Sequence, residues 1–288
     1  MVLCAGFGTR LRPLTEELPK PLVPIGDAAL LDHIVRQLRA AGLERIVVNA
    51  HHLPDAVGAA GKRLDLDVVR ETAILGTAGG VHHAGEAVGV GALVVVNGDI
   101  LAELDVTTLM AEHAAQDRFA TLAVADRRAS GQGTVGLAAD GTVVRLRGEV
   151  FGTEVAGADF VGAQVLSADA RRHLPQEGCL VGDLYLPALR RGVRLAGAAV
   201  VGRFWDIGTP SAYLACNLAW LADAGAASWP MNTVHPDILL TQCILGDATE
   251  LAGEGTLCEV VAWPGARVVA PLERAIVTRE HVVRIGNL

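Results

Sequence analysis

The chain contains little lysine, no closely paired cysteines and no long apolar run. Only Lys20 and Lys62 are lysine, so arginine supplies nearly all the positive charge. No apolar run approaches the roughly 20 residues that span a bilayer, and no basic-then-apolar leader precedes the first predicted strand. We therefore expect a cytoplasmic protein with no membrane partner. The scattered cysteines predict reduced, mostly buried thiols rather than disulfides or a zinc site. They are Cys4, Cys179, Cys216, Cys243 and Cys258.

The charge balance is acidic, with a formal net charge of -8 at pH 7. Because binding to a nucleic-acid backbone depends on clustered cations, this balance argues against a nucleic-acid partner. Any phosphate chemistry must therefore be local. Arginine offers a fixed fork of donors, whereas lysine is a compact point charge that can sit between two phosphates. Lys20, in the opening loop, stands out for this reason.

The first half of the chain alternates between short apolar strands and helices. The run "LLDHIVRQLRAAG" predicts a helix that stops at Gly42, and "RIVVNA" predicts a buried strand after it. The alternation continues through the strands "DVVRET", "ALVVVNGD" and "TLAVAD". Because alternating strands and helices imply right-handed crossovers, we expect a three-layer α/β domain with a mainly parallel central sheet.

The pattern changes in the second half. From about Gly131, strands are joined by short turns, with a hairpin signal at Asp140-Gly141. A helix "SAYLACNLAWLADAG" then stops at Gly225, and a linker "AASWPMNTV" follows. In residues 235–288, small or branched apolar residues recur about every six positions without a helical period. This spacing predicts a few turns of parallel β-helix.

A long loop follows the first predicted strand, Val2 to Ala5. Its glycines, Gly6 and Gly8, would let backbone N–H groups close around phosphate oxygens, but a bare G-x-G by itself favours an ordinary strand-to-helix turn. The stretch "GFGTRLRP" lacks the third glycine of a dinucleotide fingerprint, and the later lysine does not directly follow a glycine as in a P-loop. We expect no proper helix start here, because Pro13 and Pro21 stand in the way.

Two aspartates follow predicted strands. Asp99 ends "ALVVVNGD" and Asp206 ends "GRFWDIG". Ligands of open α/β sheets bind at the carboxyl ends of strands, and two carboxylates with phosphate oxygens and waters make a Mg²⁺ site. Taken singly, each aspartate is better explained as a turn cap. Together with the glycine-rich loop, Arg10 and Lys20, they favour nucleotide chemistry.

The opening stretch closely resembles the signature loop of the sugar-1-phosphate nucleotidyltransferases. "AGFGTRLRPLTEELPKPLVPIG" contains G-x-G-T-R, then P-L-T, then P-K-P, and "LGTAGG", "VVVNGD" and "FWDIGTPSAYLACN" follow in the order and spacing of that family. The tail resembles the extension of mannose-1-phosphate guanylyltransferase-like members, and the main domain also resembles N-acetylmuramate 1-phosphate uridylyltransferases. The resemblance implies a Rossmann-like nucleotidyltransferase domain over 1–225, a linker over 226–234 and a short left-handed β-helix-like extension over 235–288.

The resemblance also implies an activity and a site. A nucleotidyl group would pass from a nucleoside triphosphate to a sugar 1-phosphate, with Mg²⁺ as cofactor and pyrophosphate released. The resemblance favours an activity like that of a mannose-1-phosphate guanylyltransferase. Arg10 would hold the departing pyrophosphate, and Lys20 would bridge the reacting phosphates. The other implied residues are Ala5, Gly6, Gly8, Thr9, Gly76 and Thr77 for the nucleotide, Gly133 and Gly162 for the sugar, and Asp99 and Asp206 for the metal.

The chain departs from the family pattern at two places. Many relatives have Glu-Lys-Pro where this chain reads "GEV" at Gly148 to Val150, so the usual lysine for the sugar phosphate is absent. We expect Arg145 or Arg147 to substitute for it. The chain also starts about two residues short of the family's usual first strand, and we expect that its start is mis-assigned.

Two other functions fit the sequence. The chain fits a uridylyl- or thymidylyltransferase that acts on another sugar 1-phosphate, or a catalytically silent regulatory member of the family. For the tail, a few β-helical coils would leave apolar faces and strand edges exposed at both ends. Either the catalytic domain of the same chain or the tail of another subunit could cover them. We expect the tail to stabilise the enzyme and to assemble a homo-oligomer, outside the reaction centre.

Overall fold

The computed structural model describes residues 1–116, 118–231 and 233–286. Four positions of the expected domains lie outside the described residues. They are 117 in the main domain, 232 in the linker, and 287 and 288 in the extension. The chain forms two compact units. Unit 1 comprises Met1–Gly6 and Ile34–Phe204, and unit 2 comprises Phe7–His33 and Trp205–Leu288. The domain boundaries expected from the sequence remain a prediction.

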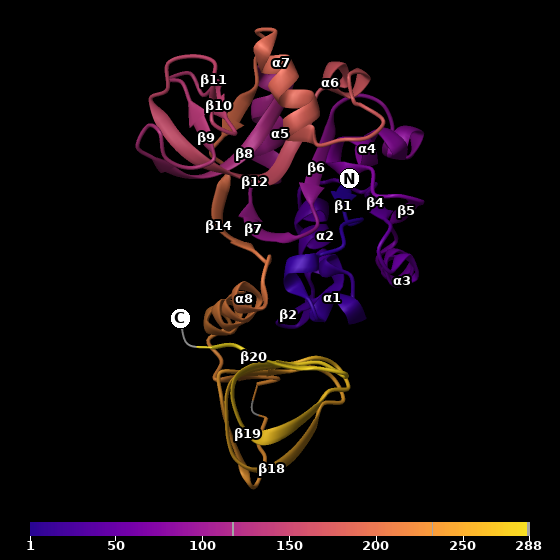
Figure 1. Ribbon diagram of the computed structural model, residues 1–288, viewed down its shortest axis with the longest axis vertical. Helices are drawn as coiled ribbons and strands as arrows, with labels where there is room; N and C mark the ends of the chain where they lie inside the picture. Colours follow the sequence, from indigo (N-terminus) through magenta and orange to yellow (C-terminus); the bar gives the residue numbers. More distant parts are fainter. Residues whose placement is uncertain (117, 232, 287–288) are drawn as a thin grey trace. The chain divides into compact units, whose positions relative to one another are not determined.

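A mixed β-sheet forms the centre of unit 1 (Figure 1). Its strand order is β11-β10-β9-β12-β6-β1-β4-β5, with β8 paired to β12 and β13 paired to β8. The strands are β1 (Val2–Leu3), β4 (Val47–Ala50), β5 (Asp67–Arg70), β6 (Leu93–Asn97), β8 (Ala120–Arg128), β9 (Val135–Leu137), β10 (Val143–Leu146), β11 (Glu149–Val150), β12 (Ala156–Leu166) and β13 (Ala196–Ala198). Strands β6, β1, β4 and β5 all run parallel, which confirms the predicted α/β fold with a mainly parallel centre.

Helices cover both faces of this sheet. On β6, Val95 belongs to an apolar cluster with Val81 of α4 (Gly76–Ala84). The next residue, Val96, instead lines a small cavity with Ile34 and Leu38 of α2 (Leu30–Ala40). Because successive strand residues point to opposite faces, α4 and α2 lie on opposite sides of the sheet, as the three-layer prediction requires. Burial on both faces also explains why β6 is apolar throughout most of its length.

The second half of the sheet is antiparallel. Strand β12 runs antiparallel to β6, β8 and β9, and β9 and β10 form the hairpin predicted at Asp140-Gly141. Gly141 has a φ of 79°, a conformation that favours glycine, and the Asp140 carboxylate accepts from the Thr142 amide over 3.0 Å. The remaining elements of this unit are α3 (Pro54–Leu64), η3 (Gly85–Val88), β7 (Ile100–Leu104), α5 (Val106–Ala115), α6 (Ala168–Arg172), η4 (Leu180–Tyr185), α7 (Leu186–Arg190) and most of β14 (Val201–Asp206).

Unit 2 contains the opening segment, a long helix and the tail. Its elements are η1 (Thr9–Leu11), α1 (Leu14–Glu17), η2 (Lys20–Leu22), β2 (Pro24–Ile25), β3 (Ala28–Ala29), α8 (Pro210–Asp223), β15 (Ser228–Trp229), β16 (Ile238–Thr241), β17 (Cys243–Leu245), β18 (Glu250–Ala262), β19 (Arg267–Val277) and β20 (Val282–Arg284). The expectation that prolines prevent helix formation in the opening loop is wrong. Pro13 directly precedes α1 and Pro21 lies in the first turn of η2, where a missing N–H costs little.

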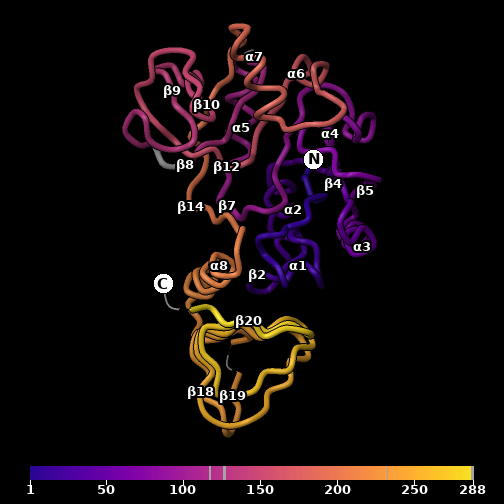
Figure 2. The backbone as a smooth tube through the Cα atoms, viewed as in Figure 1, coloured from indigo at the N-terminus to yellow at the C-terminus, as the bar shows by residue number. Residues whose placement is uncertain are grey.

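The tail forms stacked parallel coils, which Figure 2 shows as overlying turns of backbone. Ile238 pairs with Gly255, and Ile244 pairs with Val261, so strand partners lie seventeen positions apart. The coils enclose their own apolar cluster, in which Val260 and Val268 are fully buried. The β-helix-like extension predicted from the spacing is therefore confirmed. Among the described helices of the chain, none has both the length and the apolar character needed to cross a membrane.

Candidate active site

Unit 2 brings together three of the residues expected at the site. The Lys20 Nζ lies 3.8 Å from Asp206 Oδ1, and the Arg10 Nη2 lies 4.0 Å from Asp206 Oδ2. One carboxylate thus faces two cations, one at each oxygen. Lys20 is only 6% exposed, whereas the side chains of Arg10 and Asp206 are 69% and 54% exposed. The lysine is held within the fold, while the other two groups are accessible to a ligand.

The opening segment is folded tightly around Gly8. This residue has a φ of 62°, and a Cβ added there would lie 2.8 Å from the Thr15 side chain and 3.3 Å from the Lys20 Cβ. The Thr15 hydroxyl donates to the Gly8 carbonyl oxygen over 3.0 Å. Leu11 is fully buried and anchors η1, which leaves Thr9 exposed at the start of that turn. The glycine is therefore required by the packing of Lys20's own segment.

The sequence after Asp206 makes a strand-to-helix turn. A Cβ on Gly208 would lie 3.1 Å from the Arg10 guanidinium, so a glycine here lets that side chain pass close to the backbone. Thr209 caps α8, because its hydroxyl accepts from the Ala212 amide over 3.2 Å, and Pro210 occupies the first helical position. The turn fixes Asp206 at the end of β14.

In unit 1, Gly6 follows β1 and Asp99 follows β6, so both lie beyond the carboxyl ends of neighbouring strands. Strands β1 and β6 are parallel neighbours, and the Gly98 amide donates to the Leu3 carbonyl oxygen over 2.9 Å. Burial, followed by the negative charge of Asp99, raises the pKa of Cys4, which places that carboxylate near the end of β1. Ala5 is buried, and Gly6 has open space where a side chain would stand.

Gly76 and Thr77 begin α4 and contact another segment of the chain. Gly76 has a φ of 76°, and a Cβ there would lie 2.4 Å from the Gly178 carbonyl oxygen. The Thr77 hydroxyl accepts from the Leu180 amide over 2.8 Å, and the Ala78 amide donates to the Gly178 carbonyl oxygen over 2.9 Å. The start of α4 and residues 178–180 thus form one connected wall.

A buried polar pair at the same edge escaped the sequence analysis. The Asn49 side-chain oxygen accepts from the Cys4 amide over 2.7 Å, and its nitrogen donates to Glu71 over 2.6 Å. Asn49 and Glu71 are 2% and 6% exposed. The pair ties together the carboxyl ends of β1, β4 and β5. A polar residue within the otherwise apolar strand "VVNA" is the signal that could have identified it.

Close packing of the backbone requires glycine at positions 133 and 162. Gly133 has a φ of 69°, and a Cβ there would lie 2.4 Å from the Ala158 carbonyl oxygen. Gly162 has a φ of 72°, and a Cβ there would lie 2.5 Å from the Asn97 side chain. Both positions lie on or beside β12, where no larger residue fits without displacing a neighbour.

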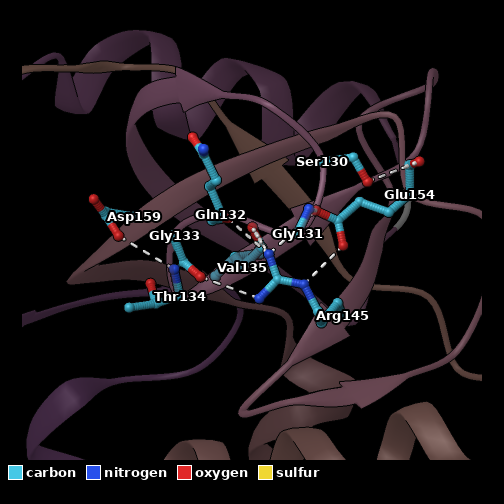
Figure 3. Close-up of polar contacts among 9 residues, drawn as sticks. All are labelled: Ser130, Gly131, Gln132, Gly133, Thr134, Val135, Arg145, Glu154 and Asp159. Atoms are coloured by element: carbon cyan, nitrogen blue, oxygen red, sulfur yellow. Dashed lines mark hydrogen bonds and ion pairs between the residues drawn. The ribbon is translucent and has the colours of Figure 1, made fainter.

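Arg145 supports the loop that contains Gly133 (Figure 3). Its guanidinium donates to both Glu154 carboxylate oxygens and to the carbonyl oxygens of Gly133, at 3.1 Å, and Gln132, at 2.7 Å. The Glu154 carboxylate also accepts from the Gly131 amide over 2.6 Å. The side chains of Arg145 and Glu154 are 13% and 9% exposed. The donors of Arg145 are thus committed to the protein.

Arg147 is placed differently. It lies exposed in the turn between β10 and β11, with a φ of 49°, and its Nη2 is 3.4 Å from the Cys179 sulfur. Burial opposes ionisation of Cys179, but hydrogen bonds from the Gly182 and Val181 amides and from Thr77, together with the charge of Arg147, lower the pKa of this thiol overall. Arg147 therefore faces the wall at 178–180.

Comparisons with known proteins cover most of the chain. A sequence profile of the family described as "Nucleotidyl transferase" matches residues 1–222. The N-acetylmuramate alpha-1-phosphate uridylyltransferase of Caulobacter vibrioides is 32% identical over 240 residues, which cover 78% of this chain and 97% of that protein. The mannose-1-phosphate guanylyltransferase of Mycobacterium tuberculosis is 34% identical over 139 residues, which cover 46% of this chain and 39% of that protein.

Solved structures share the fold. The crystal structure of HddC from Yersinia pseudotuberculosis superposes with a TM-score of 0.63 at 22% identity, covering 76% of this chain and 97% of that one. At this level of identity the likeness establishes the architecture alone.

Proposed function

We propose, from the premise that the chain belongs to the nucleotidyl transferase family, that it transfers a nucleotidyl group from a nucleoside triphosphate to a sugar 1-phosphate. A phosphate oxygen of the sugar 1-phosphate forms a bond to the α-phosphorus of the triphosphate. The bond from that phosphorus to the bridging oxygen breaks, and pyrophosphate leaves with the electron pair. Such a reaction depends on positioning and charge neutralisation more than on covalent help from the protein.

The observation that carries the proposal is the group of Arg10, Lys20 and Asp206. Arg10 and Asp206 are exposed and their contact of 4.0 Å is long, so solvent screens their attraction. A polyphosphate, with several charges and many acceptor oxygens, can displace the carboxylate from both cations. In this proposal Arg10 holds the departing pyrophosphate, and the buried Lys20 bridges the reacting phosphates. Gly6, Gly8 and Thr9 offer backbone N–H groups to the nucleotide phosphates.

The donor chemistry fits Mg²⁺. Mg²⁺ usually takes one or two carboxylates and completes its shell with waters and substrate phosphate oxygens. Asp206 has an accessible carboxylate, and Asp99 lies two residues after the end of β6. Each is proposed to supply the ion with an oxygen ligand. When bound, the ion would neutralise phosphate charge as the leaving group departs.

The remaining proposed roles concern the base and the sugar. Ala5, Gly76 and Thr77 are proposed to border the base, and Gly133 and Gly162 to line the sugar pocket. The contacts of Gly76 and Thr77 with residues 178–180 support a preformed wall rather than a flexible loop. Shape of this kind suits recognition of a flat base through backbone groups.

Arg147 is the better candidate to replace the lysine that many relatives use for the sugar phosphate. Arg145 is committed to Glu154 and to loop carbonyls, so releasing it for a substrate would break the support of the Gly133 loop. Arg147 is exposed, and within the described residues its guanidinium donates to a weak acceptor, the Cys179 sulfur. A phosphate oxygen would be a much stronger partner for its guanidinium.

We propose GTP and mannose 1-phosphate as the substrates. The tail supports this choice, because the uridylyltransferase relative is matched over 97% of its length by only 78% of this chain. The unmatched part of this chain is longer than residues 235–288, so that relative need not contain such a tail. A uridylyltransferase, favoured by the long match itself, is the second candidate.

The tail is also proposed to assemble a homo-oligomer. Leu239 on β16 and Val269 on β19 are 65% and 56% exposed, so both apolar side chains are accessible to a second copy of the chain. Light scattering on the full chain measures the mass directly. Replacing both residues with glutamate should reduce that mass to one chain, and a chain that is already single before the change would contradict this proposal.

One assay tests the activity. The purified chain is incubated with each common nucleoside triphosphate and each of mannose 1-phosphate, glucose 1-phosphate and N-acetylmuramate 1-phosphate, and released pyrophosphate is measured. We expect the highest kcat/KM for GTP with mannose 1-phosphate. A preference for UTP would favour the second candidate. No release with any pair would identify a catalytically silent member and refute the proposed activity.

A further inference from the structure

Unit 2 contains a series of buried hydrogen bonds that the proposed reaction does not use. The indole Nε1 of Trp263, in the turn between β18 and β19, donates to the Tyr213 hydroxyl over 2.9 Å. The Tyr213 hydroxyl in turn donates to the carbonyl oxygen of Pro24 over 2.6 Å. Trp263 is 3% exposed and Tyr213 is fully buried. These three residues form a relay of hydrogen bonds that links the tail, through α8, to Pro24 at the start of β2.

Neighbouring residues of α8 strengthen the attachment at Pro24. Asn217, one turn after Tyr213 and fully buried, accepts from the Gly26 amide over 2.9 Å and donates to the Tyr213 carbonyl oxygen over 3.1 Å. Gly26 has a φ of 60°, and a Cβ there would overlap the ring of Trp220 at 2.1 Å. The backbone from Pro24 to Gly26 is therefore fixed against α8 on both sides of the relay.

The tail contacts the opening segment at a second place. The Thr278 hydroxyl, which follows β19, donates to the carboxylate of Glu17 on α1. Thr278 is 3% exposed, and its hydroxyl also accepts from the His281 amide over 2.9 Å, so its direction is set by the tail. The His281 Nε2 lies 4.0 Å from a Glu16 carboxylate oxygen. The end of α1 is thus held by the last coil.

Lys20 lies between the two attachments. The chain from Glu17 to Pro24 carries η2, which is closed locally by hydrogen bonds from the Leu22 and Val23 amides to the Pro19 and Lys20 carbonyl oxygens. The tail therefore holds both ends of this stretch, while its middle packs against Gly8. A shift at either end would move the Lys20 Nζ away from its place beside Asp206.

We propose that Trp263 and Thr278 are positioning residues of the tail that fix the two ends of the Lys20 segment. This inference rests on the proposed function, in which Lys20 bridges the reacting phosphates. It gives the tail a part in catalysis within one chain, beyond stability and assembly. The family profile ends at residue 222, so neither residue belongs to the pattern that the whole family shares. The support is a property of this chain's own tail.

The test compares variants that each remove a polar group of the two attachments, and Tyr213→Phe and Thr278→Val also keep the apolar bulk. Trp263→Phe removes the N–H donor, Tyr213→Phe breaks both bonds of the relay, and Thr278→Val removes the hydroxyl at the other attachment. Because misplacement of a reacting group by about 1 Å lowers turnover steeply, we expect each variant to lose about ten-fold or more in kcat, with KM changed less than about two-fold. The double variant Trp263→Phe with Tyr213→Phe should lose no more than Tyr213→Phe alone, because one relay is broken in both.

The matched control is Tyr185→Phe. Tyr185 is the other tyrosine, is also fully buried, and within the described residues its hydroxyl has no hydrogen-bond partner. This variant should keep the wild-type kcat. A second measurement follows amide hydrogen exchange over residues 18–26, which should become faster in Tyr213→Phe and Thr278→Val but stay unchanged in Tyr185→Phe.

The outcomes separate the inference from the proposed function. If the wild-type chain releases no pyrophosphate, the proposed function fails, and hydrogen exchange alone decides whether the tail fixes the segment. If the wild-type chain is active and the relay variants keep its kcat, the inference is overturned. Unchanged exchange over residues 18–26 overturns it in either case.

Discussion

Arg145 and Glu154 meet edge to edge, with the guanidinium Nε 2.7 Å from one carboxylate oxygen and Nη2 3.1 Å from the other. Both side chains are largely buried, and both also bond the backbone of residues 131–133 (Figure 3). A bidentate pair of this kind fixes orientation as well as charge. The loop that carries Gly133 therefore depends on two residues outside it.

The pair makes stability dependent on pH. Hydrogen bonds from Arg145 lower the pKa of Glu154 in the folded chain. A carboxylate whose folded pKa is lowered adds stability above its unfolded pKa and loses it as the pH falls through the folded value. The stability difference between wild type and Glu154→Gln should therefore be largest near neutral pH and shrink below about pH 4.5. Urea denaturation between pH 3 and 7 measures this difference in the free energy of unfolding.

The control is Glu149→Gln, because Glu149 forms an exposed pair with Arg190. Its difference from wild type in the free energy of unfolding should be smaller. A gap that grows in acid would contradict the assignment.

The cations of the opening segment should act on turnover rather than on folding. Lys20→Ala and Arg10→Ala should each lower kcat about 100-fold or more, because a preorganised charge on a transferring phosphate contributes to the transition state. Lys62→Ala, at the chain's only other lysine and on the exposed side of α3, is the matched control and should be neutral. Steady-state kinetics and a thermal melt separate the two effects. Near-native kcat in either variant would remove that residue from the proposed site.

The metal proposal predicts a strict requirement for a divalent cation. Excess chelator should abolish pyrophosphate release, and added Mg²⁺ or Mn²⁺ should restore it, since hard cations take oxygen ligands. Asp99→Ala and Asp206→Ala should each lose most of the turnover. Asp55→Ala removes a carboxylate that is 91% exposed and pairs only with Arg70 in the described contacts, so it should keep full activity. Full turnover in chelator would refute the role of both aspartates.

Local patterns in the sequence were enough to predict the sheet and the residues gathered at Asp206. Strand ends, glycines and the family motif all act over a few positions, and Arg10, Lys20 and Asp206 do lie together in unit 2. The helical turns of the opening segment were missed. Their stability comes from fully buried Leu11 and Leu14 rather than from local propensity, which the prolines made look poor.

Contacts between distant residues left no such signal. Tyr213 and Pro24 are separated by 189 positions, and nothing near either residue announces their hydrogen bond. The sequence also could not decide between Arg145 and Arg147, because both sit in one short hairpin. Only the partners distinguish them: a carboxylate and loop carbonyls for Arg145, and a sulfur for Arg147. Side-chain pairing across a fold depends on the whole packing arrangement.

Arg147 should act on binding of the sugar 1-phosphate. Arg147→Ala should raise KM for that substrate about ten-fold or more, while KM for the nucleoside triphosphate and the melting temperature stay nearly unchanged, because an exposed cation contributes little to folding. Arg147→Lys should recover part of the loss, since a point charge still attracts phosphate. Arg194→Ala, another exposed arginine, is the control. An unchanged KM for the sugar 1-phosphate would exclude Arg147 as the replacement for the missing lysine.

Cys179 should be the most reactive thiol of the chain. Its pKa is lowered overall, although burial opposes this, because backbone amides, Thr77 and Arg147 favour the thiolate. Burial raises the pKa of Cys4, Cys216 and Cys243, and the pKa of Cys258 is also raised. Since the thiolate is the reacting form, limited iodoacetamide near neutral pH should add one label, at Cys179. Mass spectrometry of peptides locates the label. The Cys179→Ser variant should remain unlabelled, whereas the Cys258→Ser variant should still take up one label.

Because Thr77 is proposed to border the base, saturating nucleoside triphosphate should slow the labelling of Cys179 several-fold. Labelling at the same rate with and without every nucleotide would show that this wall lies outside the nucleotide site.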